Sequence, residues 1–379
     1  MEENKQRQIP VCQPFLNGQE SVYVNDALKT GWISSSGKYV TAFEEEFAKY
    51  CGVHHGIAVC NGTVAIHLAL VALGLGPGDE VIIPDFTMIA SAATVIYTGA
   101  KPVFVDVDAL TWCIDVRKIE AKITPCTKAI MPVSVFGNPC DMEAINDIAR
   151  RYNLRVIEDA AEAHGAEYNG KKIGSVADIT SFSFFANKIL TTGEGGMVVT
   201  NNKELADRCR YFKNLCFPLA GPRNYLHEDV GFNYRMSNLH AAIGLAQVEK
   251  ADIYRAMRIN NASLYKNFLK DVPGIIFQQD TVGGLNAHWM NAIAIAPEKS
   301  RCSRDQLMDY LKGKGIETRL LFVGMHHQPG LIKAGCDGAG DYPVTDDLTR
   351  NGLYLPSASN LTEEDIRYIC DKIQEVMRG

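Results

Sequence analysis

The alternation of short apolar runs with helical segments is the feature of the sequence that most constrains its fold. Apolar runs of strand length, most of them with β-branched residues and without polar alternation, lie at 56–60, 80–83, 102–105, 129–133 and 154–157. Such runs are typical of strands that are buried on both faces. Between them, apolar residues recur three and four apart at 63–73, 88–98 and 142–151. This order predicts right-handed βαβ crossovers, and so an α/β fold with a mostly parallel central sheet wrapped by helices.

The pattern changes after residue 178. Two further strands are expected at 179–185 and 197–200, joined by a glycine-rich connection, and a long amphipathic stretch with interruptions follows at 239–269. Helices are then expected at 304–313 and 362–377, the second of them capped by Thr362. We therefore expect a large domain of residues 1–250 and a smaller C-terminal α+β domain of residues 251–379.

Composition excludes several classes of protein. The formal charge of −6 argues against a nucleic-acid platform, which usually carries a basic stripe. Membrane insertion is not expected, because no apolar run approaches the roughly 18 residues that a span needs. The start, MEENKQRQIP, lacks the apolar core of a signal peptide, and the 11 cysteines form no C-x-x-C pair. A cytoplasmic enzyme is the expectation, with no membrane or nucleic-acid partner.

Two groups of residues follow predicted strands, where ligands of open α/β sheets bind. Asn61, Gly62 and Thr63 open a helix, so free backbone N–H groups there can hold a phosphate; a plain N-cap turn is the alternative. Asp159 ends a buried apolar strand and therefore needs a positive partner. A protonated ring nitrogen of a cofactor is one such partner, and a structural ion pair or a helix cap is the alternative.

Lys188 is the sharpest feature of the sequence. It stands among apolar and small residues just before the glycine-rich connection, where partial desolvation frees its amine as a nucleophile suited to a Schiff base. A phosphate turn, a strand-end aspartate and a shielded lysine in this order match the three groups that pyridoxal 5′-phosphate (PLP) requires. The combination predicts a PLP enzyme, although an isolated lysine would not.

Four segments together resemble the signatures of the DegT-type sugar aminotransferases. These are PLP enzymes of fold type I, the aspartate aminotransferase fold. The resemblance extends over essentially the whole chain and rests on Asn61-Gly62-Thr63, Glu158-Asp159-Ala160-Ala161, 181–188 with Gly193-Glu194-Gly195-Gly196, and 231–237. Relatives that dehydrate instead of transaminating carry histidine at the lysine position, so Lys188 favours transamination.

The resemblance also implies residue roles. Lys188 would form the Schiff base and move the proton between substrate and cofactor, and Asp159 would keep the pyridinium nitrogen protonated. Glu162 would lie near the phenolic oxygen of the cofactor. The phosphate would be bound by Gly62, Thr63 and Ser183, and by Asn233 of a neighbouring subunit, which makes a homodimer with active sites at the interface the expected assembly.

The activity implied by the resemblance is transfer of an amino group from L-glutamate to C4 of a nucleotide-linked 4-keto-6-deoxy sugar. GDP-4-keto-6-deoxy-D-mannose is the expected acceptor. The alternatives are a UDP- or dTDP-linked keto-sugar, a small phosphorylated ketone, or a non-catalytic PLP-binding regulator. Trp32, Ser35, Arg319 and His326 are the candidate substrate contacts, and the pair His288-Trp289 is a further one.

The sequence departs from the family pattern in three places. Met88 stands where an aromatic residue usually covers the cofactor ring, and a thioether can still contact a ring. The segment 317–326 lacks two expected prolines in a stretch that helps to form the sugar-nucleotide pocket of relatives, and the loop 217–225 also differs.

Metal binding is not expected from the sequence. The adjacent histidines His54-His55 and His326-His327 invite that interpretation, but no cysteine or carboxylate follows them at ligand spacing.

Overall fold

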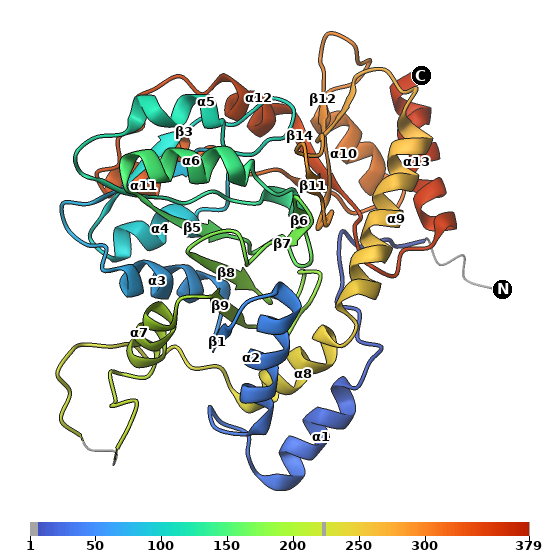
Figure 1. Ribbon diagram of the computed structural model, residues 1–379. Coiled ribbons are helices and arrows are strands. Elements are labelled where there is room, and N and C mark those ends of the chain that lie inside the picture. The colour runs from blue at the N-terminus through green and yellow to red at the C-terminus, as the bar shows by residue number, and fades with distance from the viewer. Residues whose placement is uncertain (1–6, 222–224, 379) are drawn as a thin grey trace.

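The computed structural model describes residues 7–221 and 225–378, and its centre is a mixed seven-stranded sheet in the order β1-β9-β8-β5-β4-β2-β3 (Figure 1). The strands from β8 to β3 run parallel, while β9 is antiparallel to both of its neighbours. The α/β class expected from the sequence is confirmed. The strands are β1 (His55–Val59), β2 (Glu80–Pro84), β3 (Lys101–Val105), β4 (Thr127–Ile130), β5 (Arg155–Asp159), β8 (Ile179–Ser183) and β9 (Gly196–Thr200).

Helices cover both faces of this sheet. Successive residues of β2 show the two faces, because Val81 and Ile83 belong to one apolar core and Ile82 belongs to another. The first core is shared with α3 (Gly62–Leu73), α4 (Ala90–Tyr97) and α7 (Lys203–Lys213). The second is shared with α2 (Lys38–Cys51), α6 (Met142–Tyr152) and α8 (Asn238–Val248). The uninterrupted apolar runs of the sequence follow from this double burial.

A smaller sheet with its own core lies in the C-terminal part of the chain. Its strands, in the order β10-β12-β14-β13, pack with α10 (Arg304–Gly313) and α13 (Glu363–Arg378) around a third apolar cluster. The long helix α9 (Ala251–Leu269) starts with Ala251 and Tyr254 in a core of the large sheet and ends with Tyr265 and Leu269 in the third cluster, where it packs beside α13 (Figure 1). The strands are β10 (Ile275–Phe277), β12 (Asn291–Ile295), β13 (Arg319–Leu320) and β14 (Gly352–Leu355).

One segment of the C-terminal part returns to the large sheet. It contains η3 (Met325–His327), α11 (Pro329–Lys333) and α12 (Pro343–Asn351), and Figure 1 shows α12 beside α5 (Val116–Ile119). Met325, Leu331 and Tyr342 belong to the same core as Val81. A division of the chain at residue 250 therefore stays a prediction.

The remaining elements are short or lie at the edges. They are α1 (Glu20–Thr30), η1 (Glu120–Lys122), η2 (Val135–Gly137), and a small sheet of β6 (Glu167–Tyr168), β7 (Lys171–Lys172) and β11 (Gly284–Leu285). In the described part of the chain no helix is both long and apolar enough to cross a membrane.

Several predicted boundaries differ from the observed ones by a few residues. The strand predicted to reach residue 133 ends at Ile130, close to Pro132, which has no N–H for the ladder. The helix predicted from residue 88 begins at Ala90, and the strand predicted to reach residue 185 ends at Ser183. The cap of α13 is as expected, since Thr362 Oγ1 accepts the Asp365 N–H at 3.1 Å.

Candidate active site

A cavity of about 700 Å³ lies at the carboxyl ends of the parallel strands of the large sheet. Its wall also includes β13 and β14 residues of the small sheet. Most of the predicted site residues line this cavity together: Gly62, Thr63, Met88, Asp159, Glu162, Ser183, Lys188 and Arg319.

The start of α3 forms one end of the cavity. Asn61 caps the helix, because its side chain accepts the Val64 N–H at 3.0 Å. The first N–H groups of a helix have no partner within it, so those of Gly62 and Thr63 remain available to an anion. A Cβ at Gly62 would lie 2.5 Å from the Ser183 Cβ, and only glycine therefore lets the helix start approach the end of β8.

Asp159 lies at the end of β5 and is 4% exposed. Its Oδ2 accepts the Ser91 hydroxyl at 2.7 Å, and its Oδ1 accepts the Ala161 N–H at 3.2 Å. Burial raises the pKa of Asp159, although these two hydrogen bonds and the charge of Lys188 oppose the rise. A cation placed against this carboxylate would relieve the cost of burying its charge.

Lys188 reaches the cavity from the turn that follows β8. Its Nζ lies 3.6 Å from Glu162 Oε1 and 3.7 Å from the centre of the Trp289 ring, and the side chain is 10% exposed. Burial lowers the pKa of Lys188 below its ordinary value, and the charges of Glu162 and Asp159 partly restore it. A lysine in this environment supplies a neutral amine more readily than a surface lysine does.

The turn η2 holds both partners of Lys188. Phe136 has a left-handed φ of 58°, and its N–H donates to Glu162 Oε2 at 2.8 Å. The Phe136 carbonyl accepts the Trp289 N–H at 2.8 Å. A Cβ at Gly137 would lie 2.8 Å from the His288 nitrogen, so the turn and the Trp289 segment are packed in direct contact.

The residues of the cavity fit PLP. The amide-lined turn suits a phosphate, the Asp159 carboxylate forms no ion pair with another described residue, and Lys188 supplies an amine. Asn187 Oδ1 is buried in this region without a hydrogen-bond partner among the described residues, which agrees with a polar ligand in the cavity. The donor set therefore agrees with the cofactor.

Four predicted residues lie outside this cavity. Asn233 is exposed and accepts the Arg235 guanidinium at 2.8 Å, on a segment that runs along the edge strand β1. Trp32 is 59% exposed and lines a separate hollow near Asn238, and Ser35 belongs to the same loop. The loop 217–225 includes residues 222–224, which lie outside the described residues.

His326 is the fourth of these residues, and its side chain is 9% exposed. Its Nδ1 lies 2.6 Å from Asp85 Oδ2, and its Nε2 lies 3.3 Å from Asp346 Oδ1. Both ring nitrogens thus face protein carboxylates.

Ser91 and Tyr354 contribute to the site and were not singled out from the sequence. Ser91 is fully buried and donates to Asp159, and its position three residues after Met88 at the start of α4 is the signal by which it could have been found. Tyr354 lines the cavity from β14, in a strand that looks like ordinary core in the sequence. Trp289, a candidate for contact with the substrate, lines the cavity and also lies under the Lys188 ammonium.

Comparison with known proteins gives a consistent result over nearly the full chain. The model of the DegT/DnrJ/EryC1/StrS aminotransferase family matches residues 15–374. GDP-perosamine synthase of Escherichia coli O157:H7 is 46% identical over 367 residues, covering 97% of this chain and 98% of that protein. GDP-perosamine synthase of Caulobacter vibrioides is also 46% identical, over 370 residues, with the same coverage. The crystal structure of DesI with its TDP-sugar product superposes with a TM-score of 0.89 at 32% identity, covering 98% of this chain and 93% of that one.

The fold and the cavity are those of a PLP-dependent aminotransferase of fold type I. The chain belongs to the DegT/DnrJ/EryC1/StrS aminotransferase family, and its cofactor is PLP. An amino donor and a keto-sugar are the substrates that this family implies.

Proposed function

We propose that this enzyme transfers the amino group of L-glutamate to C4 of GDP-4-keto-6-deoxy-D-mannose and so makes GDP-perosamine, a precursor for surface polysaccharide. The observation that carries the proposal is the 46% identity to two GDP-perosamine synthases over almost the whole of each chain. The buried Lys188 beside Glu162 supports a catalytic protein over a pure regulator, because a binding protein has no need of a desolvated amine.

The cofactor is held, in this proposal, by four parts of the cavity. The N–H groups of Gly62 and Thr63 and the Ser183 hydroxyl bind its phosphate. Asp159 keeps a positive charge on the ring nitrogen, and Ser91 fixes the orientation of that carboxylate through the 2.7 Å hydrogen bond. Glu162 lies on the side of the cavity where Lys188 enters.

When bound, PLP supplies an electron sink that stabilises the electrons left behind as the proton leaves the amino-acid carbon. The Lys188 amine takes this proton and later returns it. Its lowered pKa favours the neutral form that can accept a proton, and Glu162 together with the Trp289 ring stabilises the ammonium that results. One side chain therefore acts as base and then as acid.

The substrate is bound, in our proposal, by the wall that the small sheet provides. Arg319 is 62% exposed at the side chain and lies at the cavity, where it can pair with a diphosphate. Phe322 and Met88 also line the cavity, the latter from the loop after β2, and offer apolar surface to a 6-deoxy sugar. The loop of Trp32 and Ser35 lies outside the cavity, and we propose that it reaches the substrate of a second subunit. His326 is not assigned to the substrate in this proposal, because its ring nitrogens face Asp85 and Asp346.

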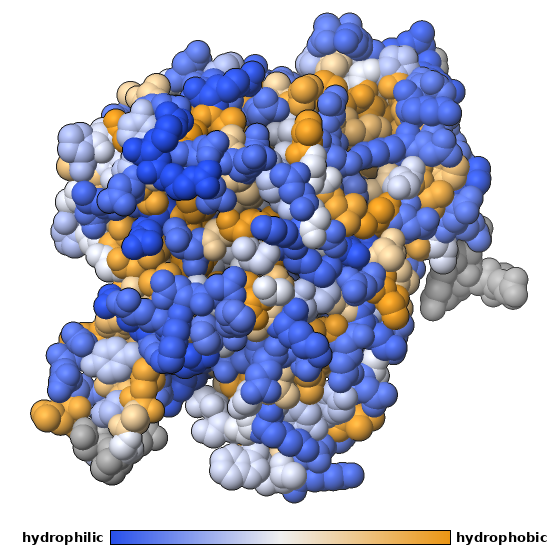
Figure 2. All heavy atoms as spheres, viewed as in Figure 1, coloured by the Kyte–Doolittle hydropathy of each residue, from blue (hydrophilic) through white to orange (hydrophobic). Residues whose placement is uncertain are grey.

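A homodimer is the assembly we propose. Asn233 lies exposed beside the edge strand β1, where it can reach the cofactor phosphate of a partner subunit. Apolar side chains are exposed nearby, among them Trp32, Ile33 and Leu219 at 59%, 46% and 53%. Figure 2 shows hydrophobic residues on the segment that projects beyond α7, and burying such surface favours association.

We also place the enzyme in the cytoplasm, since its 11 cysteines are all unpaired.

The test is a two-stage spectroscopic assay on the purified holoenzyme. Glutamate is added until the visible band of the bound cofactor disappears, the donor is removed, and keto-sugar nucleotides are then supplied singly. Return of the band with GDP-4-keto-6-deoxy-D-mannose, together with GDP-perosamine as the product, is the expected result. The same assay with Lys203→Ala, a change at a surface lysine with 78% side-chain exposure, serves as control for the loss expected in Lys188→Ala.

A different nucleotide is the second candidate, because the substrate wall around Arg319 and Phe322 departs from the family pattern. DesI, which was solved with a TDP-sugar, has the same fold. Return of the band only with a UDP- or dTDP-linked keto-sugar, or with a small phosphorylated ketone, would support the aminotransferase activity but contradict the proposed acceptor. Glutamate that never changes the spectrum would contradict the choice of donor.

A further inference from the structure

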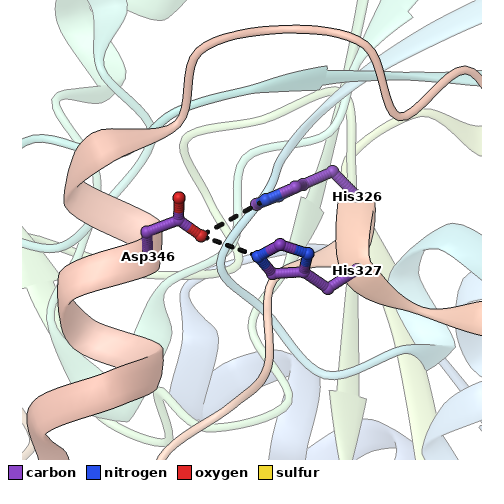
Figure 3. A group of neighbouring side chains, drawn as sticks. All are labelled: His326, His327 and Asp346. Carbon is purple, nitrogen blue, oxygen red and sulfur yellow. Dashed lines mark hydrogen bonds and ion pairs between the residues drawn. The ribbon is translucent and has the colours of Figure 1, made fainter.

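Three side chains outside the catalytic cavity converge on one point (Figure 3). His326 and His327 lie in the turn η3, and Asp346 lies in the first turn of α12. Asp346 Oδ1 is 3.3 Å from His326 Nε2 and 2.8 Å from His327 Nε2, and the three ligand atoms all lie within 4.8 Å of one another. Two imidazoles thus face a single carboxylate oxygen.

A second carboxylate fixes the orientation of one of these imidazoles. Asp85 is fully buried, and its Oδ2 lies 2.6 Å from His326 Nδ1 while its Oδ1 accepts the His326 backbone N–H at 2.9 Å. The ring also stacks on Tyr342, with 4.5 Å between the centroids. Its Nε2 is therefore held toward Asp346. A histidine whose far nitrogen donates to a carboxylate is the usual arrangement around a metal ligand in proteins.

The charges of the site are not neutralised by fixed cations. Among the ion pairs of the described residues, Asp85 and Asp346 pair only with His326 and His327 and with no lysine or arginine. The two carboxylates match the charge of one divalent cation. We propose that His326, His327 and Asp346 form a binding site for a divalent transition-metal ion, zinc above all, with Asp85 as the residue that orients His326.

The donor set selects the class of metal. Imidazole nitrogen suits zinc, copper and nickel, whereas magnesium and calcium take oxygen ligands. Tetrahedral zinc, with bonds of about 2.0–2.1 Å, separates its ligand atoms by about 3.3 Å. The distance from His326 to Asp346 already has this value, and the pair of His327 and Asp346 needs to open slightly. His327 is 52% exposed at the side chain, so it can rotate and leave an entry path.

From its position, a metal ion at this site would stabilise the structure around the catalytic cavity. Asp85 is followed by Phe86, Thr87 and Met88, of which the last two line the catalytic cavity. The turn η3 follows Phe322 of the same cavity, and Met325 N–H donates to the Asp85 carbonyl at 2.8 Å. A metal ion would join η3 to α12 and, through Asp85, to the loop that carries Met88. It acts as a clamp on this wall and takes no part in the proton transfer at Lys188.

The experiment measures zinc binding and thermal unfolding of the holoenzyme. The protein is dialysed against a chelator, returned to metal-free buffer and titrated with zinc chloride in a calorimeter, and unfolding is then followed with and without zinc. We expect about one equivalent to bind per chain and the unfolding temperature to rise with zinc, because the ion binds only the folded site. Magnesium chloride should have no effect.

Substitutions identify the ligands. His327→Ala and Asp346→Asn each change a partly exposed side chain and should abolish this binding. Asp85→Asn should weaken it by about tenfold to a hundredfold, as removal of an orienting partner does. His54→Ala is the matched control, since His54 and His55 are also adjacent histidines and should leave zinc binding unchanged. Zinc binding that survives in both His327→Ala and Asp346→Asn, or that is absent from the native protein, would overturn the proposal.

Discussion

Lys188 and Glu162 form a buried pair in which the charge of each group stabilises the opposite charge of the other. Their Nζ and Oε1 atoms are 3.6 Å apart, and their side chains are 10% and 6% exposed. Burial lowers the pKa of Lys188 and raises the pKa of Glu162, while the attraction between the two charges opposes both shifts. Burial thus favours the neutral form of both groups and their attraction favours the charged form, which suits a residue that must both accept and release a proton.

Replacing Lys188 by alanine should abolish amino transfer. We expect turnover to fall on the order of a thousandfold or more, because the variant loses the group that moves the proton. Product formation by chromatography is the measurement. Lys203→Ala should keep the native rate, and native turnover in Lys188→Ala would remove this lysine from the mechanism.

Glu162→Gln should shift the pH at which the Lys188 amine becomes reactive. The charge of Glu162 is the largest effect that raises the pKa of Lys188 against burial, so its removal should lower that pKa further. The apoenzyme should then combine with PLP at lower pH than the native protein. The rate of cofactor uptake against pH checks this, and an unchanged or opposite shift would mean that Glu162 does not face the amine in solution.

Met88→Tyr should tighten cofactor binding. Met88 lines the cavity and is 50% exposed, and its sulfur accepts the Ala90 N–H at 3.1 Å, so its thioether offers little stacking surface. An aromatic pair contributes about 0.5–1.5 kcal/mol beyond its area, which corresponds to a severalfold lower dissociation constant. Equilibrium dialysis of PLP measures it. Weaker binding in the tyrosine variant would show that the side chain at this position does not cover the cofactor.

Arg319→Ala should raise KM for the sugar nucleotide and leave the glutamate half-reaction unchanged. Arg319 pairs with Glu317 at 3.1 Å and is otherwise available to the cavity. Loss of a charge-assisted contact to a diphosphate costs about 1.5–3 kcal/mol, or about tenfold to a hundredfold in KM. Separate kinetics for the two substrates make the distinction, and an equal effect on both would point to a general loss of structure.

His164→Leu should remove a source of acid instability. His164 is buried among Phe47, Phe182 and Phe184, and neither ring nitrogen has a hydrogen-bond partner in the described part of the chain; burial lowers its pKa from 6.5 to about 3. Below pH 6.5 the unfolded chain binds a proton that the folded chain does not. The contribution of His164 to the free energy of unfolding is therefore fully present above pH 6.5. It falls by about 1.4 kcal/mol per pH unit as the pH drops toward 3.

The effect of His164 is measured by comparing the variant with the native protein, because Glu158 changes the free energy of unfolding with pH in the opposite direction. Burial raises the pKa of Glu158 from 4.5 to about 7, so its contribution to stability is greatest below pH 4.5 and is lost as the pH rises through 7. Urea unfolding at several pH values should show stability falling less steeply toward acid in His164→Leu than in the native protein. His54→Leu, at an exposed position, is the control. Parallel pH curves would contradict the burial of a neutral His164.

Much of the fold follows from local pattern in the sequence. The strand at Glu80–Pro84 and the helix at Arg304–Gly313 are predictable because the spacing of their apolar residues reflects which side chains are buried. The cavity residues Gly62, Asp159 and Lys188 are also predictable, since parallel strands bring their carboxyl ends to one edge. The convergence of His326 with Asp346 was not predictable, because a separate helix brings the carboxylate into place 19 residues beyond His327. Nothing local in the sequence foretells the left-handed Phe136 that holds Glu162.

The backbone ladder between β5 and β8 places Asp159 opposite Ser181, and the ladder between β8 and β9 places Ser183 opposite Gly196. Asp159 and Ser183, both assigned to the cofactor, are thereby tied to main-chain bonds of the large sheet, whereas Arg319 and Tyr354 come from a different sheet. Substitutions in the second sheet can therefore change which ketone is accepted without moving the residues that transfer the proton. A lineage built on this plan can diversify its sugars without rebuilding its chemistry.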